Sequence, residues 1–594
     1  MCGIIGFTGA KDAVEIIVEG LKRLEYRGYD SAGLALLNDS GFEVAKKKGR
    51  LTELEAELAK KPISGKMGIG HTRWATHGEP SDVNSHPHLG SGARIAIVHN
   101  GIIENYKQLK ERLEQRGIKF ASQTDSEVIA QLAESYYEGD LLSTVVKVAA
   151  ALEGSYALGI MSLDEPDKLV AIKKDNPLIV GISQEGNFIA SDVPAILPHT
   201  KDVYYLEDKE IAILTKDGVS FLNIDLQPIE KKLETITWSM DSAEKGGYAH
   251  FMLKEIMEQP KVLRDTIQTR LPEGFDITGF NKIVITACGS AYNAGVVGKY
   301  VIERLARVAV EVELASEFRY KDPIVDKNTL VILVSQSGET ADTIAAMREA
   351  KGRGATTFAI INVVGSTIAK EADYTIYTSA GPEIAVATTK VFSAQLALLY
   401  VIAVEFAVQL GKLTPAGANE LMDEIAALPE KVSEILENID SIARYASECI
   451  GYKSIFFIGR NVDYAIALEG SLKLKEISYI HSEAYAGGEL KHGPIALIED
   501  NTLVVAVSCV PNLYPKIFSN VEQVISRGAK VMFVSTMDAA EDDKLSLFKL
   551  PLVHELFSPS LSVIVLQLLS YYVAANKGLD IDKPRNLAKS VTVE

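Results

Sequence analysis

The chain has 594 residues, of which 47% are hydrophobic and 24% are charged, as is typical of a folded globular protein with several domains. Its formal net charge of −18 excludes nucleic acid and anionic membranes as general partners. The four cysteines, Cys2, Cys288, Cys449 and Cys509, lack the paired spacing of a metal site or a disulfide framework. We therefore expect a cytoplasmic protein without a structural metal.

Residues 1 to about 240 mix strand and helix patterns without regular alternation. Short apolar runs predict buried strands at 3–7, 94–99, 157–161, 188–190 and 211–214. Helical periodicity appears between them, at 13–24 and 126–137. This order favours a layered α+β domain over a doubly wound one.

After a polar stretch at 238–247 the pattern changes to regular alternation. A helical segment at 250–269 precedes strands at 282–286, 330–335 and 357–361, with helices at 291–306 and 342–351 between them. This βαβ order predicts a parallel sheet. Runs at 454–458 and 502–508 repeat the pattern, so we infer an internal duplication. The most apolar stretches, 396–404 and 563–575, are too short or too interrupted to span a bilayer and predict buried helices.

Cys2, directly after the first methionine, is a candidate nucleophile. A free thiol with a pKa near ~8.5 is mostly protonated at neutral pH. If Met1 is removed, an α-amino group with a pKa of ~7.7–8.0 would stand beside the thiol as a general base. The alternative is an incidental cysteine before a strand.

Three later segments favour the nucleophile. Arg73 lies in a stretch rich in polar and planar groups, and a guanidinium binds a carboxylate through two hydrogen bonds. Asn100 and Gly101 follow a strand and could stabilise an oxyanion. Asp125 lies where a helix begins, where an N-cap is the simpler interpretation. Five histidines precede residue 100, but their spacing does not match a zinc-protease site.

These segments resemble the class II glutamine amidotransferases, which are N-terminal nucleophile hydrolases with layered αββα domains. The motifs that carry the resemblance are Met1-Cys2-Gly3-Ile4, residues 24–33, 71–78 and 99–101, and Thr124-Asp125. The resemblance implies that Cys2 is the nucleophile and that Asn100 and Gly101 form the oxyanion hole. It also implies that Arg73 binds the glutamine carboxylate, that Asp125 binds its ammonium, and that Trp74, Thr76 and His77 line the pocket.

Two strand-to-helix loops in the second half suit a phosphate group. Cys288-Gly289-Ser290 and Ser335-Gln336-Ser337-Gly338-Glu339-Thr340 each offer hydroxyl and backbone N–H donors at a helix start. Ordinary capping boxes are the alternative. The second copy carries Cys509-Val510-Pro511-Asn512 in place of the second loop, so the functional loop belongs to the first copy.

Proton-transfer groups gather further along the chain. Lys473 and Glu476 share a helix face, although a surface ion pair would give the same spacing. His492 follows in a Gly-Pro turn, and histidine titrates near neutral pH. Lys589 lies in the tail, where it could form a Schiff base with a carbonyl or belong to a frayed end.

The second half resembles a duplicated sugar isomerase (flavodoxin-like) fold, and the whole chain is similar to the bacterial glutamine–fructose-6-phosphate aminotransferases. The resemblance implies that amino-sugar synthesis starts from glutamine and fructose 6-phosphate in a homodimer, without a cofactor. Glu476 would move the proton between C1 and C2, assisted by Lys473. His492, from the same subunit or from its partner, would open the ring, and Lys589 would form the Schiff base. The implied sugar-phosphate contacts are Cys288, Gly289, Ser290, Ser335, Gln336, Ser337, Thr340 and Val386.

The implied domain edges are 2–240 for the glutaminase, 241–249 for a linker, 250–425 and 426–585 for two sugar isomerase domains, and 586–594 for a tail that closes the sugar site. Two alternatives stay open. One is another class II enzyme such as amidophosphoribosyltransferase, although its acidic phosphoribosyl pyrophosphate loop is not found in the sequence. The other is a sugar-phosphate sensor without enzymatic activity.

Overall fold

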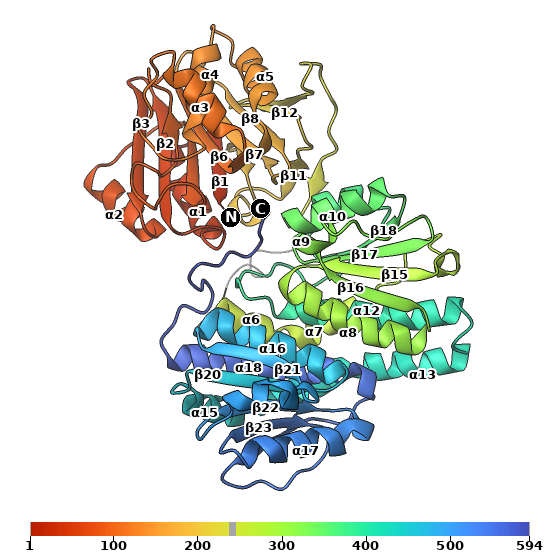
Figure 1. Ribbon diagram of the computed structural model, residues 1–594. Helices are drawn as coiled ribbons and strands as arrows, with labels where there is room; N and C mark the ends of the chain where they lie inside the picture. The colour runs from red at the N-terminus through yellow and green to blue at the C-terminus, as the bar shows by residue number, and fades with distance from the viewer. Residues whose placement is uncertain (1, 237–244, 593–594) are drawn as a thin grey trace. The chain divides into compact units, whose positions relative to one another are not determined.

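The computed structural model describes residues 2–236 and 245–592, and its chain forms two compact units (Figure 1). The first unit spans residues 1–243 together with 588–594, and the second spans residues 244–587. Most of the polar stretch predicted at 238–247 lies outside the described residues.

The first unit contains two antiparallel sheets. The eight-stranded sheet has the order β14-β11-β9-β10-β1-β4-β2-β3, and the six-stranded sheet has the order β13-β12-β8-β7-β6-β5. The strands are β1 (Gly3–Gly9), β2 (Ser31–Asn38), β3 (Gly41–Lys48), β4 (Met67–Arg73), β5 (His88–Leu89), β6 (Ile95–Ile103), β7 (Gly154–Ser162), β8 (Leu169–Lys174), β9 (Ile179–Ile182), β10 (Gly186–Ala190), β11 (Asp202–Tyr205), β12 (Ile211–Thr215), β13 (Gly218–Leu222) and β14 (Glu234–Thr235).

Along each strand, side chains alternate between the layer of helices and the other sheet, and the result is an αββα sandwich. In β1, Ile5 packs under α1 and α2, whereas its neighbour Ile4 faces the other sheet. In β6, Ile97 packs under α3, α4 and α5, whereas Val98 faces the first sheet. Because successive side chains of a strand point to opposite faces, each sheet buries both faces. The helices are α1 (Ala13–Leu24), α2 (Leu51–Lys60), α3 (Tyr106–Glu114), α4 (Glu127–Tyr136), α5 (Leu141–Ala151) and the short η1 (Val193–Ala195). The predicted layered α+β class is confirmed.

The second unit contains two parallel five-stranded sheets with one topology. Their orders, β16-β15-β17-β18-β19 and β21-β20-β22-β23-β24, are both 2-1-3-4-5 in chain order, as in flavodoxin-like folds. The predicted duplication and fold class are confirmed. The strands are β15 (Lys282–Ala287), β16 (Ala309–Leu314), β17 (Thr329–Ser335), β18 (Thr356–Ile361), β19 (Tyr374–Tyr377), β20 (Ser454–Gly459), β21 (His481–Ala486), β22 (Leu503–Ser508), β23 (Lys530–Ser535) and β24 (Leu545–Lys549).

Helices cover both faces of the two parallel sheets. Within the first repeat, α8 packs on the face that carries Ile283 and Ile285, and α10 packs on the face that carries Val284. The helices of the unit are α6 (Phe251–Met257), α7 (Gln259–Thr266), α8 (Gly289–Leu305), α9 (Ala315–Phe318), α10 (Ala341–Gly352), α11 (Thr367–Glu371), α12 (Lys390–Gln409), α13 (Pro415–Ala426), α14 (Leu428–Glu437), α15 (Ile439–Cys449), α16 (Val462–Ser478), α17 (Tyr514–Ile525) and α18 (Pro559–Asn576). Short 3-10 turns are η3 (Ile277–Gly279), η4 (Glu489–His492), η5 (Pro494–Leu497), η6 (Pro511–Leu513) and η7 (Glu555–Phe557).

Two helices of this unit are long and apolar enough to cross a membrane by length and composition. One is α12, and the other is the helical stretch Glu555–Asn576, which ends in α18. In their most apolar windows 89% and 94% of the residues are buried inside the protein. One continuous hydrophobic core contains both helices together with strands of both repeats. The prediction of buried core helices is therefore confirmed.

Candidate active sites

Cys2 lies at the start of β1, beside the end of β4. The pairing of Gly3 with Thr72 brings the chain after β4 alongside Cys2. The backbone N–H of Trp74 donates to the Cys2 sulfur at 3.3 Å, and that sulfur lies 3.6 Å from the Trp74 carbonyl oxygen. Burial raises the pKa of the Cys2 thiol. Nucleophilic attack from this thiol therefore requires a base that removes its proton.

Asn100 of the predicted oxyanion pair contacts Cys2, although the two residues are 98 positions apart along the chain. Asn100, on β6, donates from Nδ2 to the backbone carbonyl of Cys2 at 3.1 Å. Gly101 has φ +134°, and a Cβ there would lie 2.0 Å from the carbonyl oxygen of Ser155. Only glycine fits that backbone. The structure thus places the Asn100 amide beside Cys2, and the Gly101 backbone follows Asn100 on β6.

His71 orients the Asn100 amide, a function that the sequence did not reveal. Its Nε2 lies 2.9 Å from the His99 carbonyl oxygen and 3.0 Å from Asn100 Oδ1. Both partners are acceptors, so Nε2 carries the hydrogen. Burial lowers the pKa of His71 to about 3, and the ring is therefore neutral near pH 7. Because His71 occupies Oδ1, the NH₂ group of Asn100 faces Cys2.

His71 belongs to a cluster of four buried histidines, together with His86, His88 and His99. His71 stacks on His86 with ring centroids 4.0 Å apart, and His88 meets the edge of His86 at 4.6 Å. His99 bonds Ser126 Oγ through Nδ1 at 2.8 Å. Burial lowers the pKa of His86, His88 and His99 as it does that of His71. Within residues 2–236 and 245–592, no three His, Cys, Asp or Glu side chains are grouped to hold a metal ion.

Arg73 and Asp125 provide opposite charges next to the thiol. Arg73 is buried, and its Nη2 donates to the carbonyls of His77 and, at 3.1 Å, Gly78. Its Nη1 has no hydrogen-bond partner among the described residues. Asp125 accepts from the Ile103 N–H at 2.9 Å. Arg73 favours the Cys2 thiolate and Asp125 opposes it. An unpaired, buried guanidinium nitrogen is what an incoming carboxylate would satisfy.

Three more predicted pocket residues lie around this group. Trp74 contacts the Cys2 sulfur through its backbone, as described above. His77 is half-buried, with Nδ1 3.3 Å from Thr76 Oγ1 and 4.0 Å from Asp125 Oδ1. Thr76 itself is exposed. His77 therefore lies beside the carboxylate of Asp125, whereas Thr76 faces solvent.

Arg27 is a further contact of Cys2 that the sequence analysis did not single out. Its Nε donates to the Cys2 carbonyl at 3.2 Å, and its Nη1 pairs with Asp192 at 2.9 Å. Tyr26 also donates to Asp192. The signal was present, because Arg27 belongs to the motif at 24–33. The Cys2 carbonyl thus accepts two hydrogen bonds, which hold the backbone beside the nucleophile.

The two predicted phosphate loops lie at neighbouring strand ends in the second unit. Cys288-Gly289-Ser290 follows β15, and residues 335–340 follow β17, which pairs with β15. In a 2-1-3-4-5 sheet, the helices after these two strands pack on opposite faces, and the crevice between them binds ligands. The helices α8 and α10 are arranged in this way (Figure 1).

The second loop is held by its own hydroxyl groups. Ser335 Oγ accepts from the Gly338 N–H at 3.0 Å, and Ser337 Oγ accepts from the Glu339 N–H at 3.1 Å. Gly338 has φ +65°, and a Cβ there would lie 2.0 Å from Ser366 Oγ. The Gln336 carbonyl accepts from Asn362. The loop is therefore a preformed turn.

The other members of the two loops lie at the starts of their helices. Thr340 is the N-cap of α10, where its side chain makes no capping hydrogen bond, and its Oγ1 lies 3.5 Å from Ser335 Oγ. Cys288 is the N-cap of α8, and its sulfur lies 3.7 Å from Thr343 Oγ1. Gly289 is exposed and has φ +56°. Burial raises the pKa of the Cys288 thiol, so this thiol is a weak nucleophile.

Lys473 and Glu476 form an ion pair on α16 in which the lysine is buried and the glutamate is partly exposed. Their Nζ and Oε2 atoms are 2.5 Å apart, and the Lys473 side chain is 1% exposed. The alternative of a surface ion pair is therefore wrong. Burial opposes the charge of Lys473, but Glu476 and Glu469 outweigh it and raise the pKa of Lys473. The lysine is an ammonium held between two carboxyl groups.

Glu469 is the residue that the sequence analysis missed in this unit. It is fully buried, and its Oε1 accepts from Ser290 Oγ and its Oε2 from Asn293 Nδ2, both at 2.9 Å. Lys473 Nζ lies 3.6 Å from Oε1. Burial raises the pKa of Glu469 to about 7. The spacing of Glu469 and Lys473, four residues apart on one helix face, was the available signal.

Three further predicted residues are Val386, His492 and Lys589. Val386 is buried, and its N–H donates to the Asp582 carbonyl at 3.0 Å. His492 is exposed on η4. Lys589 belongs to the first unit, in which Thr592 Oγ1 donates to Asn176 Oδ1 at 3.0 Å. Lys589 and the phosphate loops thus belong to separate units.

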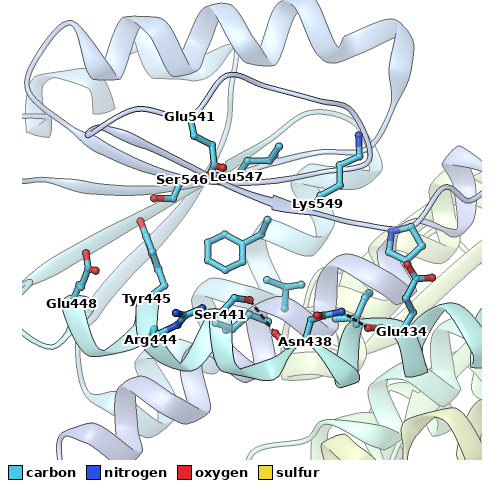
Figure 2. A pocket seen from close by; sticks show the side chains of 15 residues that line it. Glu434, Asn438, Ser441, Arg444, Tyr445, Glu448, Glu541, Ser546, Leu547 and Lys549 are labelled. Carbon is cyan, nitrogen blue, oxygen red and sulfur yellow. Dashed lines mark hydrogen bonds between the residues drawn. The ribbon is translucent and has the colours of Figure 1, made fainter.

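A cavity of about 500 Å³ lies elsewhere in the second unit, between α15 and β24 (Figure 2). Tyr445 meets Phe548 edge to face, with ring centroids 5.2 Å apart, and Arg444, Glu448 and Lys549 also line it. None of its lining residues belongs to the predicted sites.

Comparison with known proteins identifies the same parts. A glutamine amidotransferase domain model matches residues 58–222, and a SIS domain model matches residues 276–405 and 450–577. Proteins named glutamine–fructose-6-phosphate aminotransferase (isomerizing) are similar over 100% of both chains, with 55% identity in Clostridium acetobutylicum and 48% in Aquifex aeolicus. The solved C-terminal domain of glucosamine-fructose-6-phosphate aminotransferase from Francisella tularensis is 39% identical with a TM-score of 0.55, covering 57% of this chain and 99% of that one.

Proposed function

Because this chain belongs to the family of isomerizing glutamine–fructose-6-phosphate aminotransferases, we propose that Cys2 releases the ammonia which the sugar-phosphate site then consumes. The enzyme converts glutamine and fructose 6-phosphate into glutamate and glucosamine 6-phosphate. The family gives the overall reaction, whereas the functions of the individual residues below are our proposal.

In the first half-reaction, the Cys2 sulfur attacks the side-chain carbonyl carbon of glutamine. The developing oxyanion accepts hydrogen bonds from Asn100 Nδ2 and the Gly101 N–H. The thiol proton passes, through the α-amine exposed by removal of Met1, to the leaving nitrogen, which departs as ammonia. Water then hydrolyses the thioester to glutamate and restores the thiol.

Glutamine itself is held by charge. The unpaired Nη1 of Arg73 would receive the α-carboxylate, and Asp125 would receive the α-ammonium. Trp74, Thr76 and His77 would border the bound amino acid. Asn100 next to the Cys2 carbonyl is the observation that best supports this half of the proposal.

In the second half-reaction, the phosphate of the sugar would be held by Ser290, Ser335, Gln336, Ser337 and Thr340, with Cys288, Gly289 and Val386 nearby. His492 opens the ring, and Lys589 forms a Schiff base with the ketone at C2. Ammonia replaces the lysine at that carbon. Glu476, assisted by Lys473, then moves a proton from C1 to C2, which gives the 2-amino aldose.

We also propose a cytoplasmic homodimer in which a second copy of the chain supplies His492, whose exposure leaves it accessible to another subunit. The domain edges proposed are 2–240, 250–425 and 426–585, with a linker at 241–249 and a closing tail at 586–594. The matched ranges 58–222, 276–405 and 450–577 lie inside these edges, which supports them.

A Cys2→Ala variant tests the division of labour. Glutamine-driven synthesis of glucosamine 6-phosphate should disappear, while fructose 6-phosphate still binds. Loss of sugar binding together with glutaminase activity would contradict two separate sites. Wild-type protein that makes no glucosamine 6-phosphate from the two substrates would exclude the function itself.

A further inference from the structure

Glu469 joins the two repeats of the second unit at the sugar-phosphate site. It belongs to α16 of the second repeat, yet two of its three polar partners, Ser290 and Asn293, lie in the first turns of α8 in the first repeat. Its third partner is the ammonium of Lys473. A fully buried carboxyl group is costly to desolvate, and apolar packing would hold two helices together at least as well. Its position therefore points to a function beyond helix packing.

Ser290 cannot serve two acceptors at once. A serine hydroxyl has one hydrogen to donate, and in this structure Ser290 donates it to Glu469 Oε1 at 2.9 Å. A sugar phosphate bound at the α8 loop would compete for the same hydrogen. When Ser290 turns to the phosphate, Glu469 keeps Asn293 but loses one of its donors.

Lys473 is placed to replace that donor. Its Nζ lies 2.5 Å from Glu476 Oε2 and 3.6 Å from Glu469 Oε1, so a shift of about 1 Å would exchange its main partner. While Lys473 lies in this position, its ammonium occupies Glu476 Oε2, so that oxygen is not open to the sugar.

We propose that Glu469 is a positioning residue that couples phosphate binding to proton transfer, by drawing Lys473 away from Glu476 when Ser290 turns to the sugar phosphate. No covalent bond changes in this step; two donors, Ser290 and Lys473, exchange their acceptors. The inference rests on the proposed functions of Ser290, Lys473 and Glu476.

The ionisation of Glu469 supports this coupling. Burial raises its pKa to about 7, whereas Lys473 favours its charged form. The other titratable groups that face this cluster are Glu476 and Glu383, both of which act on Lys473. Only ionised Glu469 can attract the ammonium strongly, so turnover should fall as pH decreases through the pKa of Glu469.

A Glu469→Gln variant should separate binding from turnover. Glutamine can still accept from Ser290 but carries no charge for Lys473, so kcat for synthesis should fall by about ten- to a hundred-fold, the range for a lost hydrogen bond to a charged group. The KM for fructose 6-phosphate should stay within about threefold. The acidic limb of the kcat–pH profile should change, and glutamine hydrolysis at Cys2 should be unaffected.

Asp463→Asn is the matched control. Asp463 is a second buried carboxyl group on α16 with a pKa raised by burial to about 7, but it accepts from the backbone N–H of Cys509 instead of facing α8. This variant should keep the wild-type kcat and pH profile. An equal loss of kcat in Asp463→Asn would overturn the proposal, because any buried charge on α16 would then have the same effect.

A double-mutant cycle makes the coupling itself measurable. Ser290→Ala and Glu469→Gln should be non-additive in kcat, because each interrupts the same coupling from Ser290 through Glu469 to Lys473. Additive effects, or a Glu469→Gln variant with wild-type kcat and pH profile, would refute the coupling. If the Glu469→Gln protein fails to fold by circular dichroism, Glu469→Asp serves in its place, because its shorter side chain holds the carboxylate farther from Lys473 and should also lower kcat while the KM for fructose 6-phosphate stays within about threefold. Failure of the proposed function would appear separately, as absence of synthesis by the wild-type enzyme.

Discussion

Replacing Asn100 by alanine tests the glutaminase site most directly. The substitution removes the Nδ2 donor that lies 3.1 Å from the Cys2 carbonyl. Removal of one oxyanion-hole donor lowers kcat by about 10²–10³, which corresponds to ~2.7–4 kcal/mol of transition-state stabilisation. The fold should lose much less, since His71 Nε2 keeps its hydrogen bond to the His99 carbonyl at 2.9 Å and one buried hydrogen bond contributes about 0.5–1.5 kcal/mol.

The assay compares the two sites. In the Asn100→Ala variant, glutamine hydrolysis and glutamine-driven synthesis should fall together by the factor above, while the affinity for fructose 6-phosphate in calorimetric titration should stay near that of the wild type. Asn187→Ala is the matched control, because Asn187 is also a buried asparagine of the first unit and donates to the Thr215 carbonyl at 2.7 Å. It should lose stability without losing glutaminase activity.

Three results would refute this reasoning. Glutamine hydrolysis within a few-fold of wild type would mean that Asn100 does not stabilise the oxyanion. An accompanying loss of fructose 6-phosphate binding would mean that the substitution damages the whole protein. A loss of glutaminase activity in Asn187→Ala as large as that in Asn100→Ala would mean that reduced stability, not a lost oxyanion donor, causes the effect.

Three further predictions concern substrate binding and pH. Arg73→Lys should raise the KM for glutamine about ten- to a hundred-fold with a smaller effect on kcat, because lysine cannot bind a carboxylate through two parallel hydrogen bonds; an unchanged KM would exclude Arg73 as the carboxylate partner. Gly338→Ala should weaken fructose 6-phosphate binding in calorimetric titration, since its Cβ would lie 2.0 Å from Ser366 Oγ at φ +65°, and wild-type affinity would show that the loop is dispensable. Burial raises the pKa of Asp463 to about 7, so the folded state binds more protons than the unfolded state above pH ~4, and stability should decrease as pH rises from about 4 to 7. Asp463→Asn should flatten this dependence in thermal unfolding, and an equally steep curve would contradict the assignment.

Much of the fold followed from local patterns. The buried strands β1, β6, β15 and β17 are short apolar runs, and the helix α1 ends where its periodicity ends. Polar edge strands were harder to recognise. β16 and β21 lie at sheet edges, where partial exposure allows charged and polar residues that weaken the hydrophobic signal.

The sequence by itself determined the family and predicted which segments carry chemistry: Cys2, the Asn100-Gly101 pair and the loop at 335–340 were all recognisable as motifs. Only the tertiary structure decided which side chains lie next to these segments and hold them in position. His71 reaches Asn100 because β4 and β6 bring them together, and Glu469 reaches Ser290, 179 residues earlier, because α16 packs against α8. Hydrogen bonds between distant segments depend on strand register and helix packing, which leave no periodic trace in the chain, so these partners could not be read from the sequence.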